Sequence, residues 1–524
     1  MASKAVIVFL FLVSCFFSVS FADEVKVTIK SVTTIAKTDP NFICATLDWW
    51  PSDKCDYNQC PWGKAGLLNL DLGNKILFNA VKAFGPMRIR IGGSLQDQLT
   101  YNVGPAAGEC PQFKKKDDGL FKFTNGCLEM KRWDQIMDFL NKTGAKLTFG
   151  LNALMGKTKN QDDKSSNPVY DGDWESLNAR DFMVYNLKKE YDIDSYELGN
   201  ELCGEGVSAR IEAEQYGKDF LMFRKIVDEL YPNASTRPII LGPAGFYEEK
   251  WFNKFLEVTG PDVVDGVTHH IYNLGSGDDA DLINKIQDPF FLSQIAQTYK
   301  DVANSVKLFA PWSGAWVGEA GGAYNSGGKD VSHTFADGFW YLDQLGMTST
   351  LDHKVYCRQA LIGGNYALLN TTTFIPNPDY YGALLWHRLM GSKVLSTSHD
   401  GSAYLRAYSH CTKSGEDITI LLINLSNSTT FEVSVLNDMN LNLFAEKKDY
   451  VPQQQREEYH LTPEGGDIQS DVLLLNGTPL KLTNDSDIPK MGPQLADPTT
   501  PIRVSPDSFV YATLKGFQAP ACAK

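Results

Sequence analysis

The chain has 524 residues, of which 43% are hydrophobic and 21% charged, and its formal net charge is −14. This is the composition of a globular protein, and it excludes a disordered or fibrous chain. An acidic total without a basic region argues against a nucleic-acid partner.

The first 22 residues predict a secretory signal peptide. Lys4 supplies a positive charge, an apolar run of 15 residues follows from Ala5 to Val19, and Ser20-Phe21-Ala22 places small residues at a cleavage site. A membrane anchor would need about 20 apolar residues, and no second run of this length occurs. We therefore expect a mature chain that starts at Asp23, has no transmembrane segment, and reaches the extracellular space or cell wall, or a lytic vacuole or lysosome.

Seven Asn-x-Ser/Thr sequons are typical of a secreted glycoprotein. The candidate glycosylation sites are Asn141, Asn233, Asn370, Asn424, Asn427, Asn476 and Asn484.

Of ten cysteines, Cys15 leaves with the signal peptide, and the remaining nine must leave at least one thiol outside any intrachain pair. Proximity and domain grouping favour three pairs: Cys55 with Cys60, Cys110 with Cys127, and Cys411 with Cys522. We expect buried free thiols at Cys44, Cys203 and Cys357.

Strand-like and helix-like segments alternate over residues 41–391, which predicts a (β/α)8 TIM barrel. The alternative is an open doubly wound sheet, but no GxGxxG motif follows the first strand. The predicted strands are Phe42–Asp48, Met87–Gly93, Lys146–Asn152, Ser195–Glu201, Pro238–Gly242, Gly266–Tyr272, Gly314–Glu319 and Val355–Ile362. The predicted helices include Arg132–Thr143, Arg180–Tyr191, Ala209–Leu230, Asp281–Asn304 and Thr334–Leu345.

Residues 392–524 show short alternating apolar and polar runs between turns, which predict an antiparallel β-sandwich. Within residues 23–40, Val25–Lys30 predicts a further strand that pairs with this sandwich.

Two carboxylates end predicted barrel strands, where barrel enzymes carry their chemistry. Glu201 follows Asn200 at the end of the fourth strand, and Glu319 follows Gly318 at the end of the seventh. A structural Glu after an apolar strand would be costly to bury. Two carboxylates facing a sugar are the minimum set for glycoside hydrolysis.

Several segments make the chain resemble glycoside hydrolase family 79, the heparanase-like proteins and β-glucuronidases, including the plant enzyme that hydrolyses baicalin. These segments are Cys44–Asp48, Arg90–Ser94, Tyr196–Glu201, His269–Gly275, Gly318-Glu319, Gly363–Tyr366 and Pro376–Val394. The resemblance spans nearly the whole mature chain.

The resemblance implies that Glu201 is the general acid/base and Glu319 the nucleophile of a retaining mechanism. Arg90 would keep Glu319 ionised and Tyr272 would hold it. No cofactor and no metal is expected, and His269-His270 is interpreted as barrel histidines rather than a metal site.

The resemblance also assigns the substrate contacts. Asn200 would bind the sugar 2-hydroxyl, with Asp48 and Ser94 near other hydroxyls. The backbone N–H of Gly364 and the hydroxyl of Tyr366 would bind a uronate carboxylate.

We therefore expect an exo-β-glucuronidase that acts on arabinogalactan glycans or flavonoid glucuronides. The acidic total is unfavourable for gripping a polyanion such as heparan sulfate. The alternatives are a heparanase-like endo-β-glucuronidase and a β-xylosidase or β-glucosidase of the same clan. A wall-polysaccharide lectin would lack one catalytic Glu, and an adhesion protein would need an exposed basic or aromatic patch on the sandwich.

Overall fold

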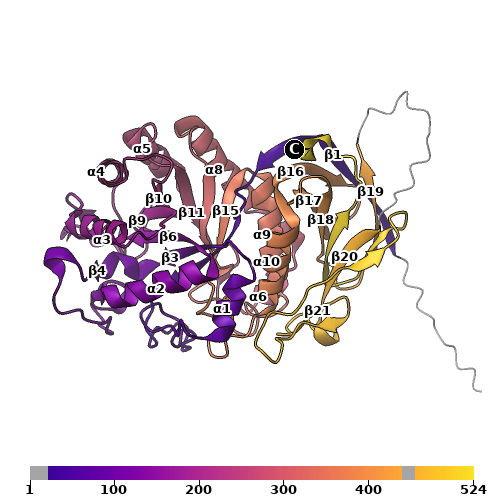
Figure 1. Ribbon diagram of the computed structural model, residues 1–524, viewed down its shortest axis with the longest axis horizontal. Coiled ribbons are helices and arrows are strands. Elements are labelled where there is room, and N and C mark those ends of the chain that lie inside the picture. The colour runs from indigo at the N-terminus through magenta and orange to yellow at the C-terminus, as the bar shows by residue number, and fades with distance from the viewer. Residues whose placement is uncertain (1–21, 439–454, 524) are drawn as a thin grey trace, which may run out of the picture.

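The computed structural model describes residues 22–438 and 455–523. The predicted signal peptide therefore lies outside the described residues, except for Ala22. The described chain forms a barrel and a large sheet, with helices α9 (Asp337–Thr350) and α10 (Pro378–Leu389) between them (Figure 1). Within these ranges, no helix is both long and apolar enough to span a bilayer.

The barrel is closed by eight parallel strands, in the order β10-β11-β13-β15-β2-β3-β6-β9. Their bounds are β2 Ile43–Asp48, β3 Arg88–Gly92, β6 Lys146–Leu151, β9 Ser195–Leu198, β10 Ile239–Phe246, β11 Gly266–Ile271, β13 Ala315–Ala320 and β15 His353–Arg358. Nearly every residue in them is buried, as expected for parallel strands covered by helices. The predicted TIM barrel is confirmed.

Helices surround the barrel: α1 Lys75–Lys82, α2 Met130–Thr143, α3 Leu177–Lys188, α4 Ala213–Leu230, α5 Glu249–Thr259 and α8 Ala296–Phe309, with α9. The single helix predicted over Asp281–Asn304 is wrong. The segment is divided into α6 (Leu282–Lys285), α7 (Pro289–Ser293) and the start of α8. Pro289 cannot continue a helix, and Asp288 instead starts a new one by accepting bonds from two backbone N–H groups.

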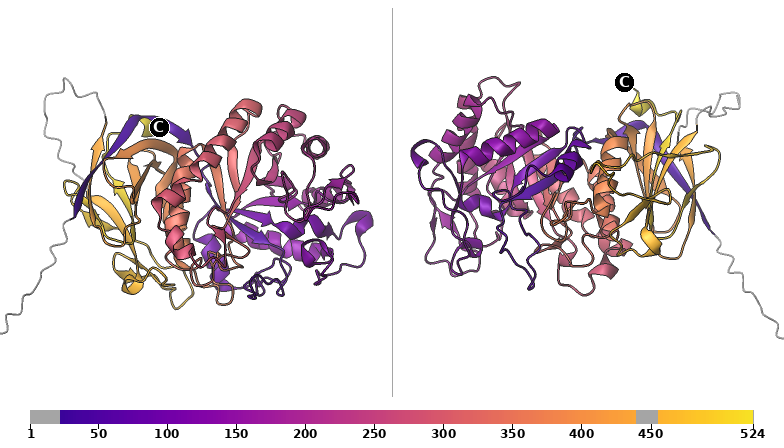
Figure 2. Two further views of the ribbon diagram at one scale, coloured as in Figure 1. Left: turned by 180° about the vertical axis from the view of Figure 1, so that it is seen from behind. Right: turned by 60° about the horizontal axis from the view of Figure 1, so that its bottom comes forward.

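The C-terminal strands are joined by hydrogen bonds into one sheet of 11 strands, and strands from distant parts of this sheet share one apolar core, as in the predicted sandwich. Its strands are β1 Asp23–Lys37, β16 Met390–His399, β17 Leu405–Thr412, β18 Ile418–Asn424, β19 Phe431–Asn437, β20 Arg456–Pro463, β21 Leu473–Leu475, β22 Thr478–Pro479, β23 Gln494–Ala496, β24 Ile502–Val504 and β25 Ser508–Leu514. The long β1 joins two parts of this sheet, because it pairs antiparallel with β16 on one side and parallel with β19 on the other (Figure 2). The register of the β1–β16 pairing shifts between Lys30 and Ala36.

The sheet buries both faces of β18, so this strand lacks the solvent-facing side that alternation predicts. Ile420 and Leu422 face an inner core shared with β1 and β19. Leu421 and Ile423 join the barrel core across α9 and α10. The ring of Phe509 stacks on Phe335 at 4.6 Å, so barrel and sheet share one continuous apolar contact.

Four disulfides are present, and the three predicted pairs are confirmed. The prediction of free thiols at Cys44 and Cys357 is wrong, since these residues form the fourth disulfide. They lie 313 residues apart, on β2 and β15, and become neighbours only when the first and last barrel strands pair. Cys203 is the buried free thiol among the described residues.

The described sequons differ in exposure. Asn141, Asn233, Asn370, Asn427 and Asn484 are exposed, and Asn476 is half-buried. Asn424 is fully buried, and its amide donates to the carbonyls of Thr429, Val504 and Ser505. Asn424 therefore cannot carry a glycan in the folded chain, which corrects that prediction.

Removing the Cys44–Cys357 disulfide should destabilise the protein more than removing Cys55–Cys60. The first closes a loop of 313 residues and the second a loop of 5, so the chain-entropy difference is about 4 kcal/mol. Paired Cys→Ala variants, compared by denaturant unfolding, measure this difference. Equal losses in the two double variants would contradict it.

Candidate active site

A cleft of about 1020 Å³ opens at the carboxyl ends of the barrel strands. Glu201, Glu319, Asp48, Ser94, Tyr272 and Tyr366 all line it. Barrel enzymes carry their chemistry at this end, because the loops that follow the strands converge there.

Glu319, near the end of β13, has both carboxylate oxygens engaged. Arg90 on β3 donates Nη1–H to one oxygen at 2.8 Å, and the Tyr272 hydroxyl donates to the other at 2.6 Å. Arg90 is 1% exposed, so its positive charge is poorly screened by water. The two donors together fix the orientation of the Glu319 carboxylate in the cleft.

Arg90 also fixes its other neighbours. Its Nε donates to Glu197 at 2.7 Å, and its Nη2 donates to the Asn200 side-chain oxygen at 2.8 Å. Glu197 in turn accepts from the hydroxyl of Thr268 at 2.8 Å. The guanidinium of Arg90, on β3, is therefore bonded to side chains on β9 and β13. Burial alone would lower the pKa of Arg90, but the neighbouring carboxylates of Glu197 and Glu319 raise it.

Glu201 lies in a less polar environment than Glu319. Burial raises its pKa to about 7, and only the charge of Arg90 opposes this shift. Its nearest polar partner is His270 on β11, whose Nδ1 lies 3.0 Å from a Glu201 oxygen. Burial lowers the pKa of His270 to about 4, so this histidine is neutral near pH 7 and does not hold Glu201 ionised.

The turn after β9 aims Glu201 into the cleft. Gly199 has φ +74°, and a Cβ there would lie 2.0 Å from the Tyr216 hydroxyl, so only glycine fits. The backbone N–H of Asn200 donates to Asp97 at 2.8 Å, and that of Glu201 donates to the Ala244 carbonyl at 2.7 Å. Bonds from their backbone N–H groups to two distant segments therefore hold the Asn-Glu pair.

One carboxylate oxygen of Glu201, one of Glu319 and a ring nitrogen of His270 lie within 4.8 Å of one another. The spacing could hold a cation, but Arg90 and Tyr272 already occupy both oxygens of Glu319. The set instead places two carboxyl groups from different strands around the same small volume.

Of the other residues predicted to bind substrate, Asp48 and Tyr366 line the cleft and Gly364 does not. Asp48 and Tyr366 lie together, because Gln359 donates to Asp48 at 2.9 Å and lies 3.4 Å from the Tyr366 hydroxyl. Burial and the nearby Glu319 raise the pKa of Asp48. Gly364 differs from the prediction, because its N–H donates to the Pro61 carbonyl at 3.3 Å and it does not line the cleft.

Asn200 is also oriented differently from its predicted role. Its side chain is 1% exposed and its amide oxygen accepts from Arg90, so the structure places it beneath the cleft.

Sequence reasoning missed three residues here. His270 was interpreted as an ordinary barrel histidine, yet it contacts Glu201. Gln359 directly follows β15 and could have been found by the rule that located Glu201 and Glu319. Phe246, the last residue of β10, lines the cleft and carried no polar signal.

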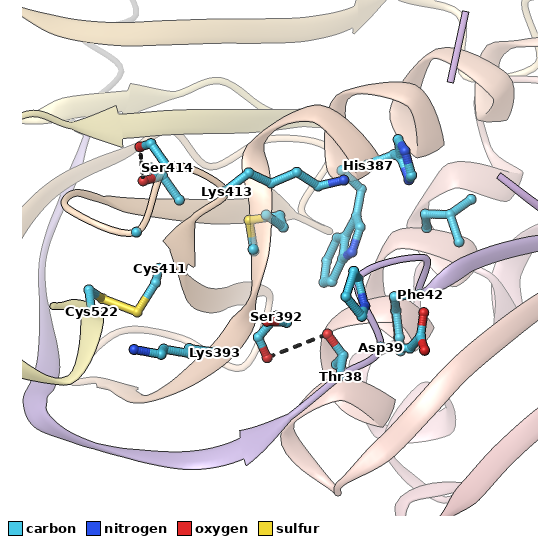
Figure 3. A pocket seen from close by; sticks show the side chains of 17 residues that line it. Thr38, Asp39, Phe42, His387, Ser392, Lys393, Cys411, Lys413, Ser414 and Cys522 are labelled. Atoms are coloured by element: carbon cyan, nitrogen blue, oxygen red, sulfur yellow. Dashed lines mark hydrogen bonds between the residues drawn. A yellow bond between two sulfur atoms is a disulfide. The ribbon is translucent and has the colours of Figure 1, made fainter. Parts of the chain in front are cut away.

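A second cavity, of about 460 Å³, lies where the barrel meets the sheet (Figure 3). It is lined by Thr38, His387, Lys413 and the Cys411–Cys522 disulfide, among others. Among the described residues that line this cavity, Asp39 is the one with a carboxyl group, so they include no carboxylate pair like that of the larger cleft.

A family model described as glycosyl hydrolase family 79, N-terminal domain, matches residues 24–346. The chain belongs to this glycoside hydrolase family. It is 51% identical over 508 residues to heparanase-like protein 2 of Arabidopsis thaliana, with 93% of each chain covered. It is 40% identical to baicalin-beta-D-glucuronidase of Scutellaria baicalensis, covering 92% of this chain and 90% of that one.

The fold is similar to that of the GH51 arabinofuranosidase from Xanthomonas axonopodis, with a TM-score of 0.64. That match covers 94% of this family 79 chain and 100% of the other at 15% identity, so it shows a common fold.

Replacing Arg90 by Ala should lower the free energy of unfolding by about 3–5 kcal/mol, because Glu197 and Glu319 would stay buried without their cation. The matched control is Arg503→Ala, which removes an exposed pair with Glu432 and should cost less than about 1 kcal/mol. Denaturant unfolding of both variants measures the difference, and similar losses would contradict the central role of Arg90.

Proposed function

We propose that the chain is a secreted retaining exo-β-glucuronidase. The observation that carries this proposal is the carboxyl pair, with oxygens of Glu201 and Glu319 within 4.8 Å of each other. Retaining glycosidases hold their carboxyl groups about 5–5.5 Å apart, whereas inverting ones leave about 6.5–9.5 Å for a water.

In the first step, an Oε of Glu319 bonds to the anomeric carbon while the bond to the leaving-group oxygen breaks. Glu201 gives its proton to that oxygen and becomes a carboxylate. Arg90 and Tyr272 hold the Glu319 carboxylate in place for attack, and burial favours the protonated form of Glu201.

In the second step, Glu201 takes a proton from water, and the water oxygen bonds to the anomeric carbon. The bond to Glu319 breaks and restores its carboxylate. Two inversions at the same carbon give a sugar with its original configuration.

Glucuronic acid is the proposed sugar because the relative from Scutellaria baicalensis is a named glucuronidase and Tyr366 offers a hydroxyl beside Asp48 and Gln359. The cleft lining does not suit a dense polyanion, since its described residues include seven carboxyl side chains and four lysines. The acids are Asp48, Asp53, Asp56, Asp117, Asp118, Glu201 and Glu319, and the lysines are Lys54, Lys115, Lys122 and Lys159. This balance favours a single uronate on a small aglycone or a glycan end.

Secretion is proposed on chemical grounds. Four disulfides require an oxidising compartment, and five sequon asparagines are exposed to solvent. The destination would be the extracellular space and cell wall, or a lytic vacuole.

Purified protein should hydrolyse an aryl β-glucuronide in preference to the matched β-glucoside. Glu319→Gln should lower kcat by at least about 10³-fold, because the nucleophile is lost. The control Glu249→Gln, on the exposed start of α5, should leave turnover unchanged. Glucoside turnover alone would favour a β-glucosidase, and turnover of long uronate polymers alone would favour an endo-acting enzyme.

Activity should fall as pH rises through the pKa of Glu201, about 7. Glu201 is protonated below this pH and can donate, and above it the proton is absent, so kcat/KM is lost on the alkaline side. Glu201→Gln should remove this alkaline limb when assayed with a leaving group that needs no protonation, such as a dinitrophenyl glucuronide. A limb that persists in the variant would assign the titration to another group.

A further inference from the structure

A continuous row of aromatic rings runs along the active-site cleft. The ring centroids of Phe246 and Tyr272 lie 6.2 Å apart, and those of Tyr272 and Tyr366 lie 6.5 Å apart. Trp62 follows at 6.4 Å from Tyr366, and Trp50 at 6.4 Å from Trp62. All five side chains line the cleft.

The two ends of this row lie near different residues of the active site. Tyr272 stands within it and bonds Glu319, and Tyr366 lies beside Gln359 and Asp48 on one side. On the other side, the ring of Phe246 meets that of His270 edge-on at 6.4 Å, and His270 contacts Glu201. Since the proposed function makes Glu201 the donor to the leaving group, the Phe246 end of the row is the leaving-group side.

Phe246 is the solvent-exposed ring of this row. It is 40% exposed, whereas Tyr366, Trp62 and Trp50 are 4%, 1% and 9% exposed. An exposed aromatic ring beside a buried reaction centre is apolar surface that a ligand can cover.

The position of Phe246 relative to Glu201 is fixed by backbone bonds. Glu201 N–H donates to the carbonyl of Ala244, two residues before Phe246, and Val207 N–H donates to the Glu201 carbonyl at 2.9 Å. Val207 and the neighbouring Pro168 and Tyr170 also line the cleft. Together they add apolar surface to that of Phe246.

We propose that Phe246, with Val207 and Tyr170, forms a leaving-group subsite for a planar aromatic aglycone, such as a phenol. A phenolic ring can stack on Phe246 and cover its exposed area. A planar ring can match the whole face of Phe246, whereas a sugar leaving group can offer this ring only a puckered face of C–H groups. This inference rests on the proposed function and narrows its substrate class.

The test compares kcat/KM for phenyl β-glucuronide, methyl β-glucuronide and a glucuronosyl-galactose disaccharide. Phe246→Ala should lower the value for the phenyl substrate about tenfold, because an aromatic contact and its buried area are lost, and the other two less than about threefold. Each variant is compared with wild type on the same substrate, so differences in leaving-group reactivity cancel. Phe290→Ala, which removes a ring that is 68% exposed on α7, is the control and should change none of the three.

Phe246→Leu keeps an apolar side chain but lacks the ring, and it should lose activity mainly on the phenyl substrate, as Phe246→Ala does. A folding defect of the Ala variant therefore does not decide the result. Both variants should keep the wild-type pH profile. Equal losses on all three substrates, or a shifted alkaline limb, would show that Phe246 acts only by packing on His270. A loss confined to the disaccharide would assign the subsite to a sugar, and a wild-type protein that turns over no glucuronide would overturn the proposed function itself.

Discussion

One buried guanidinium organises the reaction centre. Arg90 is buried inside the barrel, and its N–H groups donate to Glu197, Glu319 and Asn200. Removing a cation from water is costly unless carboxylates surround it, and here two of them do. The same contacts that make this burial tolerable also fix the distance between β3, β9 and β13, and thus between the two cleft carboxyl groups.

The two carboxyl groups share a small volume but have different surroundings. Glu319 receives hydrogen bonds from a guanidinium and from a phenol, which hold both of its oxygens. Glu201 has a neutral histidine as its nearest partner and loses water on burial, so its protonated form is stabilised. A pair with opposite protonation is what acid-assisted nucleophilic displacement at a sugar requires.

The C-terminal sheet supports the barrel rather than standing apart from it. β18 contributes one face to the sheet core and the other to the barrel core, and the Tyr511 hydroxyl donates to a carbonyl of α10 at 3.1 Å. The strand that precedes the barrel, β1, lies between β16 and β19 in this sheet. Strands of the same sheet therefore precede and follow the barrel segment in the sequence, and this sheet restrains both ends of that segment.

Much of this arrangement was predictable from the sequence. Eight strand-like segments alternating with helices identified the barrel, and the rule that barrel chemistry lies at carboxyl strand ends located Glu201 and Glu319. These signals are local, since each depends on residues within a few positions of one another. The motifs around them also pointed correctly to the family.

Contacts between distant segments had no local signal. Cys44 and Cys357 pair because the first and eighth strands become neighbours when the barrel closes, and His270 meets Glu201 because β11 and β9 both flank β10. Gly364 lay in a recognised motif, yet its N–H donates to Pro61, far back in the chain. The sequence by itself determined which strands form and which carboxylates end them; only the tertiary structure decided their partners, because charge, burial and hydrogen bonding depend on distances that barrel closure sets.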